Sequence, residues 1–109
     1  MMLKNYKDPV LNQILEKIIP EFHPKKIILF GSRARNVQTE NSDYDLMLIL
    51  DKSDLSRIER AQKARRLTWK LGHAIDYFIY TEDEYNEWKD ELNSIPYAAA
   101  TTGLELEFV

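Results

Sequence analysis

Hydrophobic positions along the chain follow two patterns, one typical of helices and one typical of buried strands. Between Pro9 and Pro20 apolar residues recur at helical spacing, Asp8 stands at the N-cap, and Pro20 closes the predicted helix. Elsewhere, short apolar runs rich in β-branched residues indicate buried strands rather than helices. These strands are predicted at residues 25–30, 43–50 and 74–81.

A longer amphipathic helix is predicted over residues 54–72, from a cap at Ser53 or Asp54 to an end near Gly72. Its apolar positions predict a side that faces the core, made of Leu55, Ile58, Ala61, Ala64, Leu67 or Thr68, and Leu71. Its basic positions predict an outer face, made of Arg60, Lys63, Arg66 and Lys70. Such a face usually serves solvation, with docking of an acidic partner as the alternative.

The C-terminal third contains two further helix signals. Thr81 and Glu84 have the spacing of a capping box, which predicts a helix that runs to about Leu92. Ser94 caps a second, shorter helix, and Gly103 ends it. This helix and a short edge strand are predicted at residues 95–100 and 104–108.

The order of these elements predicts a small α/β (α+β) fold, a mixed sheet of three to four strands flanked by helices. No linker or repeat divides the chain, so residues 1–109 are expected to form a single domain. Because a helix lies between the second and third strands, that pair is expected to be parallel. The loop before Asp43 allows either direction for the first pair.

Composition narrows the function classes. The chain has 109 residues, 44% of them apolar, and no cysteine, which excludes disulfides and thiolate metal sites and is typical of a cytoplasmic protein. No apolar run is long enough to cross a bilayer, so no membrane association is expected. The formal net charge of −3 argues against nonspecific binding of nucleic acid, because proteins that bind it in this way are strongly basic. The apolar content and the aromatic residues of the predicted helices leave a homo- or hetero-oligomer open.

Five residues suggest one catalytic site. Gly31 and Ser32 follow the first strand, Asp43 and Asp45 are two residues apart at the start of the second, and Asp76 opens the third. Residues i and i+2 of a strand share a face, so Asp43 and Asp45 can bind the same cations. Two Mg²⁺ ions could then hold a triphosphate and its attacking oxygen, with Asp76 as the third carboxylate. Gly31 would let the backbone approach a phosphate, and Ser32 would add a donor.

Simpler interpretations exist for each of these residues. Asp43 and Asp45 could be solvated acids at a strand edge, and Asp76 could cap a turn. Arg33 and Arg35 could bind triphosphate charge, although loop arginines are more often solvated. The joint occurrence of the glycine-serine pair with three acids in order favours the catalytic interpretation.

At these residues the sequence resembles the minimal nucleotidyltransferases of the DNA polymerase beta superfamily, the family of the antitoxins in HEPN/MNT toxin–antitoxin pairs. The family signature is an apolar residue and Gly-Ser, then ten residues, then Asp-x-Asp. Phe30-Gly31-Ser32 and Asp43-Tyr44-Asp45 match it without a gap, and Ile75-Asp76-Tyr77 stands where the third carboxylate belongs. One departure is Asn36, where the family often has glycine.

The resemblance implies a small nucleotidyltransferase fold and a magnesium-dependent transfer of AMP from ATP to a hydroxyl group. Asp43, Asp45 and Asp76 would bind two Mg²⁺ ions and perform the catalysis, while Gly31 and Ser32 would bind the nucleotide phosphates. The acceptor that the family suggests is a tyrosine of a HEPN-domain toxin, with this chain as the antitoxin and protein adenylyltransferase.

Two alternatives remain open at this point. The chain could be a binding-only antitoxin or nucleotide-binding protein without transfer activity. It could also be a small-molecule nucleotidyltransferase of the aminoglycoside type, although such relatives use an additional helical domain to hold the acceptor.

Overall fold

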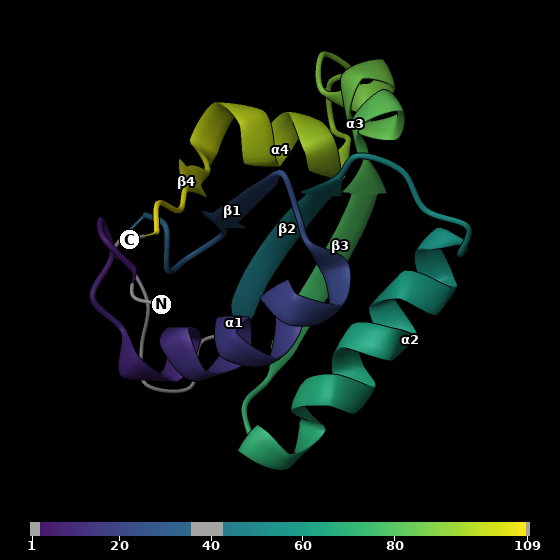
Figure 1. The fold of residues 1–109 in the computed structure, drawn as a ribbon. Helices are drawn as coiled ribbons and strands as arrows, with labels where there is room; N and C mark the ends of the chain where they lie inside the picture. Colours follow the sequence, from purple (N-terminus) through teal and green to yellow (C-terminus); the bar gives the residue numbers. More distant parts are fainter. Residues whose placement is uncertain (1–2, 36–42, 109) are drawn as a thin grey trace.

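The computed structural model describes residues 3–35 and 43–108 of the chain (Figure 1). The loop residues Asn36, Asn41 and Ser42 of the motif lie outside these ranges. In chain order the described elements are α1 (Pro9–Phe22), β1 (Lys26–Phe30), β2 (Tyr44–Leu50), α2 (Arg57–Thr68), the 3-10 turn η1 (Trp69–Leu71), β3 (Ile75–Thr81), α3 (Glu82–Trp88), α4 (Ile95–Thr102) and β4 (Leu104–Glu105).

The strands form one mixed sheet in the order β3-β2-β1-β4. β2 and β3 are parallel, which confirms the prediction from the helical crossover. β1 runs antiparallel to β2 and to β4, so the first pair adopts one of the two directions that the sequence allowed. The predicted α/β fold with a mixed, four-stranded sheet is therefore confirmed.

Helices cover both faces of the sheet (Figure 1). On one face α1 and α2 pack over the larger apolar cluster, whose members include Leu11, Ile14, Leu15, Ile18, Leu29, Leu46, Leu48, Ala64, Tyr77 and Ile79. The opposite face carries a smaller cluster beneath α4, made of Ile28, Phe30, Met47, Ile49, Tyr80 and Ala99. Alternate residues of β2 and β3 therefore belong to different clusters, as the period of a strand requires.

Helix α1 begins as predicted but ends later. The Asp8 side chain caps it by accepting hydrogen bonds from the backbone N–H groups of Val10 and Leu11. The prediction that Pro20 closes the helix is wrong, because the helix includes Pro20 and continues to Phe22. The end comes at His23, whose backbone is left-handed and whose N–H donates to the Ile19 carbonyl.

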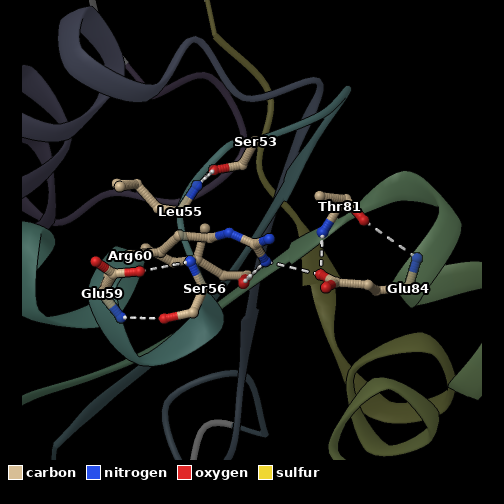
Figure 2. Close-up of polar contacts among 8 residues, drawn as sticks. Ser53, Leu55, Ser56, Glu59, Arg60, Thr81 and Glu84 are labelled. Carbon is tan, nitrogen blue, oxygen red and sulfur yellow. Dashed lines mark hydrogen bonds and ion pairs between the residues drawn. The ribbon is translucent and has the colours of Figure 1, made fainter.

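Helix α2 begins three residues later than predicted. Its N-cap is Ser56, which forms a capping box with Glu59, whereas the predicted cap residue Ser53 accepts a hydrogen bond from Leu55 outside the helix (Figure 2). The helix proper ends at Thr68, and η1 carries the chain to the left-handed Gly72.

The predicted faces of α2 are also partly wrong. Arg60, assigned to the basic outer face, is 4% exposed, and its guanidinium donates to the Ile79 carbonyl (3.0 Å) and the Glu84 carboxylate (2.7 Å) (Figure 2). Ile58, assigned to the core side, is 71% exposed. Most of the other predicted core positions hold, because Ala64 is buried and Ala61, Leu67 and Leu71 pack against the larger cluster. Arg60 departs from the pattern, because its partly buried pair with Glu84 of α3 holds it against β3.

The C-terminal elements match the predictions in kind and differ in length. Thr81 and Glu84 form the predicted capping box, but α3 ends at Trp88 rather than near Leu92. Helix α4 extends to Thr102, and β4 is only two residues long. In the described part of the chain, no helix has the length and apolar character needed to cross a membrane.

Candidate active site

The sheet register brings two of the predicted acids side by side. Asp45 is the second residue of β2, Asp76 is the second residue of β3, and the parallel pairing sets them directly opposite each other. Both lie on the sheet face of Met47 and Phe78, which is opposite to α1 and α2. Asp43 directly precedes the first residue of β2 and is exposed. It therefore lies at the same end of the parallel strands as Asp45 and Asp76.

Because β1 is antiparallel to β2, the glycine-serine turn that follows β1 lies at this same end of the strands. Phe30, the last residue of β1, is the register partner of Asp45, so Gly31 and Ser32 leave the sheet beside that carboxylate. Gly31 has a positive φ of 76°, and a Cβ atom there would collide with the Asp45 carboxylate. The contact and the conformation both require glycine at this position.

Like charges meet in this arrangement. Burial raises the pKa of Asp45 to about 6, and the charge and hydrogen bonding of Asp76, together with the charge of Asp43, act in the same direction. Asp76 and Asp43 are themselves exposed. The structure thus concentrates negative charge around a half-buried carboxylate, an arrangement that a cation would stabilise.

The chemistry of these side chains suits a hard divalent cation. Carboxylate oxygens are the protein ligands that Mg²⁺ takes most readily, and Mg²⁺ is commonly held by one or two carboxylates together with substrate phosphates. Among residues 3–35 and 43–108, no group of three or more histidine or acidic side chains is already arranged to hold a metal ion. The paired carboxylates of Asp45 and Asp76 have the chemistry of cation ligands, but a divalent cation would need further oxygens from elsewhere.

Phe30 and Phe78 form an aromatic pair next to the acids. Their ring centroids are 5.4 Å apart with an interplanar angle of 52°. Phe78 follows Asp76 by two residues on the same strand face, and Phe30 is paired with Asp45. The rings form an apolar boundary beside the carboxylates. The sequence indicated a role for Phe30 only through the motif, which has an apolar residue before Gly-Ser.

A second polar group supports the turn from the other face of the sheet, and sequence reasoning missed it. The Tyr44 hydroxyl donates to the Asp8 carboxylate (2.7 Å), and the Arg33 guanidinium lies over the Tyr44 ring (3.9 Å) and near Asp8 (3.9 Å). Arg33, considered above as a possible triphosphate ligand, is thus engaged on the α1 side. Its contacts fix the start of β2 against α1 and the turn that follows Gly31. The alternative phosphate candidate, Arg35, is exposed and bonds the Gly31 carbonyl.

Comparisons with known proteins identify the family of this chain. The family model described as "Polymerase beta, Nucleotidyltransferase" matches residues 12–94, which include all five predicted site residues. A protein of Methanocaldococcus jannaschii, named "Putative protein adenylyltransferase", is 38% identical over 63 residues, which is 58% of this chain. The chain spans about three fifths of that relative, 60% of its length.

Two solved structures share the fold. One is titled "Crystal structure of the toxin-antitoxin with AMP-PNP"; it is 24% identical, with a TM-score of 0.50 over 88% of this chain and 68% of that one. The other is the crystal structure of a "putative nucleotidyltransferase" from Sulfolobus solfataricus, 22% identical, with a TM-score of 0.52 over 74% of this chain and 72% of that one.

Proposed function

This chain belongs to the polymerase beta nucleotidyltransferase family, and on that basis we propose that it transfers AMP from ATP to a hydroxyl group of a protein. The single observation that carries the proposal is the register that sets Asp45 beside Asp76 and next to the Gly31 turn. The relative named as a protein adenylyltransferase and the toxin–antitoxin structure with AMP-PNP support ATP and a protein acceptor.

In the proposed reaction the acceptor oxygen forms a bond to the α-phosphorus of ATP while the bond to the β-phosphate oxygen breaks, and pyrophosphate leaves. Asp43, Asp45 and Asp76 would hold two Mg²⁺ ions, which neutralise phosphate charge when bound. Asp76, which is exposed and lies opposite Asp45, would accept the hydroxyl proton. Gly31 admits phosphate oxygens close to the backbone, and Ser32 offers a hydroxyl and an N–H donor.

The acceptor that we propose is a tyrosine of a HEPN-domain toxin, which makes this chain the antitoxin of a pair. The structural neighbour titled as a toxin–antitoxin supports the pairing. A protein acceptor also suits the open position of Asp43 and Asp76, since a docked protein can reach exposed carboxylates directly.

Label transfer tests the proposal. α-Labelled ATP and Mg²⁺ are added with the protein to a host-cell lysate, and the products are resolved by gel for the wild type and Asp45→Asn. We expect one labelled band that requires Asp45 and is absent with γ-labelled ATP. If label appears on an aminoglycoside instead, the acceptor is a small molecule. If no label transfers from any nucleotide while a partner still binds, the binding-only alternative replaces the enzyme.

A further inference from the structure

The outer edge of β3 is a backbone surface separate from the carboxylate side chains. β3 is the terminal strand of the sheet and pairs with β2 on one side only. The Ala74 carbonyl accepts a hydrogen bond from the Tyr44 N–H in β2. The backbone N–H and C=O groups of the even-numbered residues of β3 therefore point toward β2. Those of Ile75, Tyr77 and Ile79 point to the other side, where an edge strand presents donors and acceptors to a partner.

Arg60 shows which part of that edge is already used. Its guanidinium donates to the Ile79 carbonyl, so one acceptor at the Ile79 end is occupied. No hydrogen bond among the described residues similarly occupies the Ile75 and Tyr77 groups of the edge. The open part of the edge is therefore the half nearest Asp76.

A groove runs along this edge between β3 and α2. It consists of two adjoining hollows of about 350 and 280 Å³ that share Arg65 and Tyr77. We call it the α2–β3 groove; it is bounded by Arg57, Ile58 and Arg65 on α2 and by Ile75, Tyr77 and Ile79 on β3. An extended segment placed along the edge would pass Ile75, the neighbour of Asp76.

The side chains of the groove favour an acidic and partly apolar occupant. Arg57 and Arg65 line it, and no acidic residue of the described chain does. The exposed Ile58 (71%) and, at the far end, Trp69 (68%) offer apolar contacts. A second copy paired edge to edge through a two-fold axis would bring the same arginines together, which disfavours self-association.

We propose that the α2–β3 groove binds an extended acidic segment of the acceptor protein as an added strand on β3. The proposal rests on the proposed function for the identity of the partner, because a segment paired with Ile75 would pass the backbone of Asp76, whose carboxylate lies on the face opposite to α2. Backbone hydrogen bonds to the edge would supply affinity, and Arg57 and Arg65 would select acidic side chains at the alternate positions that face α2.

A peptide probe tests the groove without catalysis. A ten-residue peptide of alternating glutamate and valine is titrated into the ¹⁵N-labelled full chain, and a matched peptide with lysine in place of glutamate is the control. We expect the acidic peptide to shift the amide signals of Ile75, Tyr77 and Ile79. Arg65→Glu should weaken binding at least about fivefold, while Arg66→Glu, an exposed neighbour outside the groove, should leave it nearly unchanged.

Three results would overturn the groove proposal: no shift along β3, equal shifts with both peptides, or concentration-dependent dimerisation through β3. Stronger displacement of the same signals by a single-stranded oligonucleotide would also overturn it, in favour of nucleic acid. In label transfer, Arg65→Glu should lower acceptor labelling at least about fivefold with unchanged affinity for Mg²⁺ and AMP-PNP, and Arg66→Glu should not. Absent labelling by the wild type with intact peptide binding would reject the transferase and retain the groove.

Discussion

Strand β3 carries a charged cluster at each end, and the two clusters differ in kind. Near its end, the Arg60 guanidinium is buried but meets the Ile79 carbonyl and the Glu84 carboxylate (Figure 2). At its start, Asp76 lies beside Asp45, and burial, together with the neighbouring like charges, raises the pKa of Asp45 to about 6. In the first cluster the opposite charges of Arg60 and Glu84 are paired, so removing one partner should destabilise the fold. The second is costly in the free protein, which is characteristic of a site built for a ligand.

The largest expected effect is on activity. We expect Asp45→Asn to lower AMP transfer by at least about 100-fold, because it removes a proposed cation ligand at the reacting phosphate. Asp51→Asn, which changes an exposed acid immediately after β2, should keep nearly full activity. Initial rates of pyrophosphate release measure both variants, and equal losses would contradict the assignment.

At the matched end of the strand, removal of Arg60 should mainly affect stability. Arg60→Met leaves the Ile79 carbonyl and the partly exposed Glu84 carboxylate without their donor, so we expect a loss of about 2–3 kcal/mol in the free energy of unfolding. Arg66→Met on the exposed side of α2 should change it by less than about 0.5 kcal/mol. Urea unfolding provides the comparison, and a loss as small as that of the control would show that the ion pair is not structural.

Two glycines with the same φ allow the cost of backbone strain to be distinguished from an effect on the site. Gly31 and Gly72 both have a φ of 76°, but an added Cβ meets the Asp45 carboxylate at Gly31 and nothing within 4 Å at Gly72. Alanine should cost about 1 kcal/mol at Gly72 from the backbone alone and more at Gly31. Only Gly31→Ala should also lower transfer activity. Thermal unfolding and initial rates are measured for both variants. Equal losses of stability and activity would contradict the close contact between Gly31 and the Asp45 carboxylate.

The smallest expected effect is a pH dependence. Burial would raise the pKa of Glu84, but hydrogen bonds from Arg60 and Thr81 and the Arg60 charge outweigh it and lower the pKa. Glu84 therefore contributes stability that is present above its unfolded pKa and is lost as the pH falls through its lower folded pKa. Between pH 5 and about 3, Glu84→Gln should lose less stability than the wild type, by about 1 kcal/mol or less. Glu87→Gln, exposed on the same helix, should follow the wild-type curve.

The site could be predicted from the sequence to a large extent, because strands have a period of two. That period placed Asp45 on one face of β2, and the parallel crossover placed Asp76 beside it. The direction of β1 could not be predicted, since a loop of this length permits both. The role of Arg33 was equally hidden, because its contact with Tyr44 depends on α1 packing against the sheet.

Two positions of α2, Ile58 and Arg60, were the main failure of the sequence-based prediction. The pattern of this helix places Ile58 toward the core and Arg60 outward, as hydropathy alone would suggest. The burial of Arg60 goes with Glu84, twenty-four residues away, whose carboxylate pairs with its guanidinium. Such long-range pairing leaves no periodic signal in the sequence of the helix.

The central claim is that the negative charges around Asp45 destabilise the free protein and that a bound cation relieves this repulsion. Thermal unfolding with and without ligand tests it most directly. The wild type and Asp45→Asn are compared alone and with Mg²⁺ and AMP-PNP. We expect Asp45→Asn to unfold at a higher temperature than the wild type without ligand, since it removes a half-buried charge next to two others. With ligand, the wild type alone should gain several degrees. Equal ligand-induced shifts in both proteins, or a less stable free Asp45→Asn, would contradict the account.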